Sequence, residues 1–329
     1  MFPLPIIDLH CDLLTYLSNR KGATINDIHE IGAALPHLES GNVVHQIMAV
    51  FALTKPGSVA FAKAQIEIFK QLGKGDAFEI VSTSEESLNI DRKKVGITAA
   101  IENASVLVEE EEDISLAISR LDCMIETCGR IFYISFTHHT ENRFGGGNYS
   151  DNIGLKKDGK QLLEYLDDKS IAIDFSHASD QLMIDSLDFI DQNQLKIPVM
   201  ASHSNFRKHW EHVRNLPDEL AQEIVNRKGL IGMNFLRNYI HESQPNHLLE
   251  HISYGLHTMA ENALAFGADY FDIKAITDPE RQPLFFKNHE NASKYPEVLD
   301  ALKKRGIKNS KLEKLSNENV LAYIKRSWT

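Results

Sequence analysis

Six acidic or histidine side chains follow short apolar runs and could together bind metal ions. They are His10, Asp12, Glu102, His177, His203 and Asp269. His10 and Asp12 are two residues apart, so on an extended segment both point the same way and can bind one cation. His177 and His203 could hold a second cation. Glu102 could bridge the two ions, because an unpaired buried carboxylate would be costly.

Imidazole and carboxylate ligands favour Zn²⁺, with Mn²⁺, Co²⁺ and Fe²⁺ as alternatives. Two such ions, about 3.5–4 Å apart, would share a hydroxide that is nucleophilic at neutral pH. Asp269 could accept its proton and pass it to a leaving amine. The sequence has no G-x-S-x-G motif and no cysteine–histidine pair at strand ends, so covalent catalysis is the weaker hypothesis. Each residue alone also has a simpler interpretation, a polar turn for Asp12 or Asp269 and a packed or capping role for a histidine.

Eight short apolar, β-branched runs are predicted as the strands that position these residues. They span 4–8, 44–53, 95–101, 130–136, 171–175, 197–201, 230–235 and 263–266. Helical periodicity lies between them, notably over 61–72, 114–128, 159–167, 181–192 and 218–227. This alternation favours a (β/α)₈ TIM-type barrel, with a doubly wound open sheet as the alternative.

The barrel would explain why the candidate residues occur where they do. In barrel enzymes the carboxyl ends of the strands form the active-site face. Six of the eight predicted strands lead into a histidine or an acidic residue there. One of the six is the fourth strand, which is followed by His138. The loops 139–152 and 272–294 follow strands and could shape or cover the pocket.

The ends and the composition set further limits. Segments 296–305 and 310–327 are predicted as amphipathic helices packed on the barrel, and because no linker appears, residues 1–329 are predicted to form one domain. The 329 residues carry 35 basic and 46 acidic side chains, a net charge of −11, which disfavours a nucleic-acid partner. The sequence shows no membrane span, no signal peptide and only three cysteines, so we expect a cytoplasmic protein without a membrane partner.

Eight motifs carry a resemblance to a known family. They are DLHCD, AIEN, SFTHHT, AIDFSH, VMASHS, HVRNLPDEL, MNFLRNYI and AFGAD. Their order and spacing resemble the membrane (renal-type) dipeptidases, peptidase family M19 of the amidohydrolase superfamily, over residues 4–325. The H-x-D of His10 and Asp12 is typical of this family, whereas the superfamily usually has H-x-H.

The resemblance implies a (β/α)₈ barrel with a two-zinc centre, in a family that often forms homodimers. His10 and Asp12 would bind one zinc. His177 and His203 would bind the other, and Glu102 would bridge the two.

The resemblance also implies roles around the metals. His138 would contact the substrate carbonyl and stabilise the tetrahedral intermediate, while Asp269 would be the acid/base. Arg214 would receive the C-terminal carboxylate of a dipeptide, which a guanidinium fork fits bidentately. Tyr239 matches a substrate-binding tyrosine.

Two departures from the family pattern lie close to these residues. The segment from Gly267 to Asp272 lacks the trailing glycine of the family signature. Asp269 aligns better with the acid/base because it follows the strand directly, and Asp272 is the rival. Asn103 stands where the family usually has glycine. Both changes could alter the substrate range without removing the metals.

The sequence therefore predicts a zinc-dependent dipeptidase that hydrolyses free dipeptides, including those with a C-terminal D-amino acid. The alternative is another amidohydrolase, acting on N-acyl amino acids, lactones or cyclic amides. A more remote alternative is a metal- or ligand-binding protein without catalysis.

Overall fold

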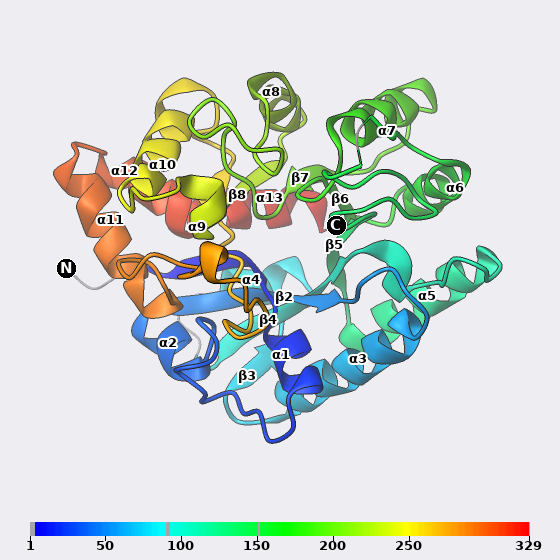
Figure 1. Ribbon diagram of the computed structural model, residues 1–329, viewed down its shortest axis with the longest axis horizontal. Coiled ribbons are helices and arrows are strands. Elements are labelled where there is room, and N and C mark those ends of the chain that lie inside the picture. The colour runs from blue at the N-terminus through cyan, green and yellow to red at the C-terminus, as the bar shows by residue number, and fades with distance from the viewer. Residues whose placement is uncertain (1–3, 90–92, 151, 329) are drawn as a thin grey trace.

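Eight parallel strands close into a barrel in the computed structural model, which describes residues 4–89, 93–150 and 152–328 (Figure 1). In order around the barrel they are β1 (Ile6–Cys11), β2 (Val43–Phe51), β4 (Val95–Glu102), β5 (Ile131–Ser135), β6 (Ala172–Asp174), β7 (Val199–Ala201), β8 (Leu230–Met233) and β9 (Leu264–Phe266). β9 pairs with β1, and β2 pairs with β4, which closes the ring. The predicted (β/α)₈ barrel is confirmed.

One further strand, β3 (Phe78–Ile80), was not predicted. It pairs with the first residues of β4, where Phe78 lies opposite Val95. β5 pairs with the later part of β4, starting at Ala99. β3 thus occupies the edge of β4 that β5 leaves open at the amino end. Three residues are too few to show a periodic pattern, which is why the sequence did not reveal this strand.

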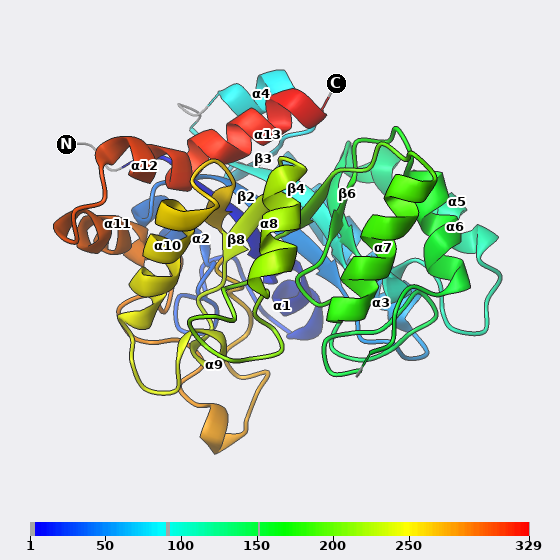
Figure 2. The ribbon, with the colours of Figure 1, turned by 90° about the horizontal axis from the view of Figure 1, so that it is seen from above.

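Helices surround the barrel (Figure 2). They are α1 (Leu13–Asn19), α2 (Leu35–Ser40), α3 (Ser58–Lys74), α4 (Ser84–Leu88), α5 (Ser115–Cys128), α6 (Lys157–Leu166), α7 (Asp180–Gln192), α8 (Asp218–Asn226), α9 (Arg237–Ile240), α10 (His247–Thr258), α11 (Tyr295–Lys304), α12 (Asn309–Glu313) and α13 (Asn319–Ser327). The five central helices predicted from periodicity correspond to α3, α5, α6, α7 and α8. No helix within the described residues is both long enough and apolar enough to cross a bilayer.

The C-terminal helical region differs from its prediction. Residues 296–305 form α11 as expected, but 310–327 is not one regular helix. A π-helical segment, Lys314–Glu318, joins α12 to α13. This segment contacts β1 and β9, and Asn317 donates a hydrogen bond to the carbonyl of Pro5. Tertiary contacts with the barrel therefore accompany the change in helical pitch.

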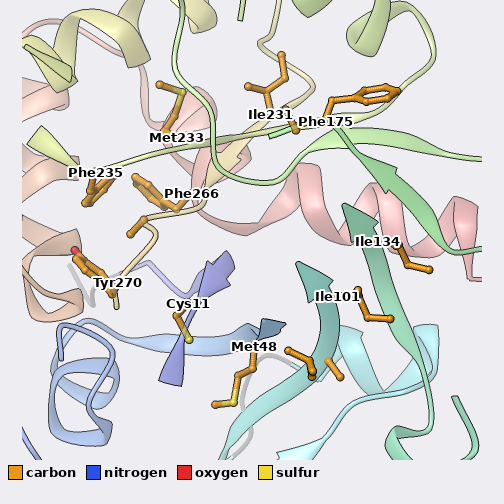
Figure 3. Close-up of a cluster of buried hydrophobic side chains, with 14 of the residues drawn as sticks. Cys11, Met48, Ile101, Ile134, Phe175, Ile231, Met233, Phe235, Phe266 and Tyr270 are labelled. Carbon is orange, nitrogen blue, oxygen red and sulfur yellow. The ribbon is translucent and has the colours of Figure 1, made fainter. Parts of the chain in front are cut away.

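The larger of two buried apolar clusters lies on the strands and the helices packed against them. Figure 3 shows Met48, Ile101 and Ile134 along neighbouring strands of this cluster. Phe235 meets Phe266 edge-on, with ring centroids 5.8 Å apart. This packing holds the strands in register, so that their carboxyl ends meet at one rim.

The smaller apolar cluster closes the amino end of the barrel. Phe132 of β5 packs against Tyr323 and Trp328, with ring centroids 5.8 and 5.4 Å away. The guanidinium of Arg130, directly before β5, lies 4.5 Å from the Trp328 ring centroid. α13 therefore covers this end of the barrel, opposite the strand ends that carry the candidate site (Figure 2).

Candidate metal centre and active site

The carboxyl ends of the strands bring the predicted metal-binding and acid/base residues together. His10 lies within β1 and Asp12 just beyond it, Glu102 ends β4, and His177, His203 and Asp269 follow β6, β7 and β9. Each is at most 7% exposed. The sequence predicted the strand ends slightly wrongly, because β1 continues past Asp8 to Cys11 and so includes His10.

One set of ligand atoms surrounds the Nε2 atom of His10. This nitrogen lies 3.7 Å from Oδ2 of Asp12, 3.6 Å from Oδ1 of Asp269 and 3.6 Å from Oε2 of Glu102. These separations are too long for hydrogen bonds. Two ligands about 2.1 Å from one tetrahedral zinc lie about 3.4 Å apart, so the spacing suits shared coordination.

A second set surrounds the other oxygen of Glu102. Its Oε1 lies 2.7 Å from Nε2 of His177 and 3.6 Å from Nε2 of His203. The two histidine nitrogens are 2.9 Å apart. Glu102 thus directs one oxygen to each set, which is the arrangement that a bridging carboxylate requires.

The hydrogen bonds of His10 test whether a cation fits. Its Nδ1 lies 2.6 Å from the hydroxyl of Tyr133, which also donates to the carbonyl of Leu9 at 3.2 Å. A hydroxyl that donates to Leu9 accepts from Nδ1–H, which leaves a lone pair on Nε2. That Nε2 is buried and has no hydrogen-bond partner among the described residues. A lone pair facing carboxylates is repulsive unless a cation or a proton lies between them, so the residues fit a metal.

The charges of the site agree with this fit. Burial alone would lower the pKa of His10, but without a cation Glu102 and the neighbouring carboxylates outweigh it and raise the pKa to about 10, so that a proton would occupy the Nε2 position at which a cation fits. Burial raises the pKa of Glu102 well above its ordinary value, and that of Asp269 to about 6. Burial also lowers the pKa of His177 well below its usual range. Carboxylates that favour a positive charge at His10, beside the neutral imidazole of His177, form an environment that favours divalent cations.

Two buried aspartates that the sequence analysis missed hold these ligands in place. Asp174, the last residue of β6, accepts hydrogen bonds from Ser135 at 2.6 Å and from Ser202 at 2.9 Å. The Ser202 hydroxyl lies 2.8 Å from Nδ1 of His203. This chain of contacts orients the His203 ring with Nε2 toward Glu102. Partners of this kind fix the orientation of a ligand histidine, and their loss typically lowers metal affinity by about 10- to 100-fold.

Asp8 performs the corresponding task on β1. It accepts hydrogen bonds from the backbone N–H of His10 at 2.9 Å, from the Gln46 amide at 2.7 Å and from the backbone N–H of Ala268 at 3.0 Å. The Tyr295 hydroxyl donates to it as well. Asp8 thus connects β1, β2 and the segment after β9. Both aspartates had a signal in the sequence, since each lies in an apolar strand shortly before a candidate ligand. Asp8 precedes His10 by two residues, and Asp174 precedes His177 by three.

A cavity of about 370 Å³ opens onto this centre. Its described lining includes Asp12, Glu102, His138, His139, His177 and Asp269 at the polar end, and Phe51, Leu53, Leu236, Phe271 and Ile276 among the apolar residues. The loop after β9, expected to shape the pocket, contributes to this wall. A polar base below an apolar entrance is typical of a site for a small, partly apolar substrate.

Two neighbouring histidines line the cavity beside His177. The ring of His138 lies 4.3 Å from that of His177, and burial lowers its pKa well below the usual range. It is therefore neutral and can donate a hydrogen bond. His139, which the sequence analysis did not select, contacts Asn148 through Nδ1 at 3.1 Å and stacks on Tyr149. Its presence in the cavity wall is a finding of the structure.

Arg214 lies behind the cavity wall and does not line it. The residue is 2% exposed, and one of its Nη atoms is 3.5 Å from Nε2 of His177. Its guanidinium donates to the carbonyl of Ser176 and lies 5.0 Å from the ring centroid of Tyr239, which lines the cavity. No carboxylate among the described residues forms an ion pair with it, and its Nε has no partner. A buried guanidinium without a counter-ion is suited to bind an anionic group of a ligand.

Comparison with known proteins identifies the family. The family model described as "Membrane dipeptidase (Peptidase family M19)" matches residues 1–327. The chain belongs to this family. Membership confirms the resemblance seen in the sequence and implies a metal cofactor, in agreement with the clustered ligands.

Solved structures and a curated relative agree with the assignment to family M19. The dipeptidase AC, a metallopeptidase of family M19, has a TM-score of 0.82 and 18% identity, covering 99% of both chains. A metallopeptidase from Rhodobacter sphaeroides, liganded with a phosphinate mimic of L-Ala-D-Ala, has a TM-score of 0.82 and 17% identity, covering 99% of this chain and 100% of that one. Dipeptidase tcpJ from Claviceps purpurea (strain 20.1) is 24% identical over 201 residues, 59% of this chain and 44% of that protein. The match therefore spans less than half the length of this curated relative.

The two departures from the M19 pattern can now be placed. Asp269 lies at the centre, and its Oδ2 accepts a hydrogen bond from Asn234 at 2.9 Å. Asp272 also lines the cavity, but its Oδ2 lies 2.9 Å from Nε of Arg20. Asn103 has a φ of 70°, a positive value that favours glycine and that asparagine tolerates better than most residues.

Proposed function

We propose that this chain is a dipeptidase that uses two divalent cations, Zn²⁺ in the first instance. The observation that carries the proposal is the orientation of Glu102, whose Oε2 lies 3.6 Å from Nε2 of His10 and whose Oε1 lies 2.7 Å from Nε2 of His177. His10, Asp12 and Glu102 would hold one cation. His177, His203 and Glu102 would hold the other. When bound, the cations would activate a water molecule and polarise the scissile carbonyl.

Asp269 and His138 supply the remaining chemistry of the proposal. Asp269 would accept the proton of the attacking water and transfer it to the leaving amine, with Asn234 fixing one of its oxygens. His138, neutral in its buried position, would donate a hydrogen bond to the oxygen that gains charge in the transition state. Oδ1 of Asp269 is also as close to His10 as a shared ligand would be, so the test below must separate proton transfer from metal binding.

The substrate is proposed to be a free dipeptide. Arg214 would bind its C-terminal carboxylate next to Tyr239, because the guanidinium is buried and lacks an ion-pair partner among the described residues. This contact requires the guanidinium to shift past Tyr239 into the cavity, which Arg214 does not line. The ligand of the Rhodobacter sphaeroides relative mimics a dipeptide with a C-terminal D-residue. On that basis we include dipeptides with a C-terminal D-amino acid.

One preparation can test the proposal in two ways. Elemental analysis gives the metal content per chain, and a panel of L-L and L-D dipeptides is assayed with and without a chelator. Two metals per chain and chelator-sensitive cleavage are expected. Two metals without dipeptide cleavage would point instead to N-acyl amino acids, lactones or cyclic amides. A folded, zinc-supplemented chain without metal would overturn the mechanism.

We extend this proposal to a cytoplasmic location, expected from the sequence, and to a homodimer, which the family resemblance implies. Subcellular fractionation tests the location. Light scattering of the metal-loaded protein measures its mass in solution, and the mass of a monomer would contradict the proposed homodimer.

A further inference from the structure

An arginine that the sequence analysis did not select lines the active-site cavity. Arg281 ends the 3₁₀ turn Pro279–Arg281 in the loop after β9. Its Nε is buried without a hydrogen-bond partner, and no carboxylate of the described chain forms an ion pair with its guanidinium. Arg281 is the one arginine or lysine among the described residues that line this cavity.

The backbone that carries Arg281 is anchored on both sides. Arg237 of α9 donates from Nη2 to the carbonyl of Glu280 at 2.7 Å and from Nε to the carbonyl of Pro283 at 2.8 Å. Its backbone N–H also bonds to the carbonyl of Leu284 at 2.8 Å. The loop is thus attached to the helix that carries Tyr239. A guanidinium presented from an anchored segment loses less freedom when it binds a ligand.

The acidic residues of the cavity do not neutralise Arg281. Asp272 is paired with Arg20, and its Oδ1 accepts from the backbone N–H of Lys274 at 2.9 Å. Asp12 and Asp269 face His10 at the metal centre. The cavity wall therefore presents an unneutralised guanidinium, a group that matches a carboxylate in shape and charge.

Tyr239 is the residue through which Arg281 and Arg214 can be related in space. Arg214 lies over the Tyr239 ring, which shares the cavity wall with Arg281. One guanidinium in the cavity wall and another behind its Tyr239 suit a ligand end that carries two carboxylates.

We propose that Arg281 binds the side-chain carboxylate of the C-terminal residue of the substrate. The preferred substrates are then dipeptides that end in aspartate or glutamate, in the L or D form. This inference rests on the proposed dipeptidase function, in which Arg214 binds the backbone carboxylate of the same residue.

Matched acid and amide substrates test the inference. In the metal-loaded protein, kcat/KM is measured for Ala-Glu and Ala-Gln, each with an L or a D second residue. A charged hydrogen-bonded pair should favour the acid by about 10- to 100-fold. R281A should reduce this acid-to-amide ratio by most of that factor while leaving Ala-Gln cleavage close to wild type. R281K should retain part of the preference. K287A removes an exposed charge from the same loop and should leave the ratio unchanged.

Three results would overturn the inference. R281A could lower both rates equally, which would indicate a structural role. It could instead abolish discrimination between free and C-terminally amidated dipeptides, which would assign Arg281 to the backbone carboxylate. The enzyme could also prefer an acidic side chain only in the N-terminal residue, cleaving Glu-Ala faster than Gln-Ala. Arg281 would then bind the side chain of the N-terminal residue of the substrate.

A binding measurement separates this inference from the proposed function. Calorimetry compares glutamate with glutamine as product ligands of the wild type and R281A. If no dipeptide is cleaved, the dipeptidase proposal fails, yet tighter binding of glutamate that is lost in R281A would still support the Arg281 subsite. Equal binding of both amino acids by the wild type would overturn it.

Discussion

The two ends of the barrel satisfy their buried side chains in different ways. At the amino end, Phe132, Tyr323 and Trp328 pack against one another and need no external group. At the carboxyl end, three buried carboxylates lie 3.6–3.7 Å from Nε2 of His10, which has no hydrogen-bond partner in the described chain. The first end stabilises the fold by itself, whereas the second has the residues to bind metal. Changes at the two ends should therefore affect different properties.

The largest effect is expected from Asp269→Asn at the carboxyl end. Loss of the proposed proton transfer should lower kcat by about 10²- to 10⁴-fold. Stability should be unchanged or higher, because burial already penalises the Asp269 charge. Steady-state kinetics at saturating metal and elemental analysis of the same preparation check this. Asp272→Asn is the control, since that side chain pairs with Arg20. If the Asp269→Asn variant loses metal, Asp269 is a ligand and the assignment as acid/base alone is wrong.

The opposite outcome is expected from Trp328→Ala at the amino end. Removing a large aromatic side chain that is 4% exposed should lower the free energy of unfolding by about 3–5 kcal/mol. The kcat of the folded, metal-loaded protein should not change. Urea unfolding and activity assays without denaturant measure the two properties. A parallel fall in kcat and metal content would show that the two ends are coupled.

A smaller effect is expected one contact away from the metal ligands. Ser202→Ala removes the hydroxyl that orients His203, so metal affinity should fall by about 10- to 100-fold. Activity should return when metal is added in excess. Ser135→Ala is a matched control, because Ser135 donates to the same Asp174 oxygen without touching His203. Chelator competition measures both variants. Equal losses in both would assign the effect to Asp174 alone.

This contrast also explains how much the sequence could predict. The ligands were visible because histidine and acidic residues stood where apolar strands ended, and the alternation of elements indicated the barrel. Asp8, Asp174 and Tyr133 were not visible, because their roles depend on contacts between strands far apart in the chain. Arg281 lies in a loop without periodicity. Its place in the cavity wall depends on how that loop folds over the barrel, which the sequence does not reveal.

The smallest effect is expected at Asn103, where this chain departs from the glycine usual in the family. Its amide donates to the carbonyl of Ala52 at 2.8 Å, and its Oδ1 accepts from Asn142 at 3.0 Å. Asn103→Gly should relieve the strain of the positive φ, which favours the variant by less than about 1 kcal/mol.

The same change leaves buried partners such as the Ala52 carbonyl unsatisfied, at a cost of about 1–3 kcal/mol. The net result should be a loss of about 1 kcal/mol in the free energy of unfolding, with metal content unchanged. Asn103→Ala loses the same hydrogen bonds without relieving the backbone, so it should be less stable than the glycine variant. Urea unfolding of the three proteins ranks them. A glycine variant more stable than the wild type would show that the backbone strain at Asn103 costs more than its hydrogen bonds contribute. The role of Asn103 would then be to position the loop that carries Asn142, and not to stabilise the fold.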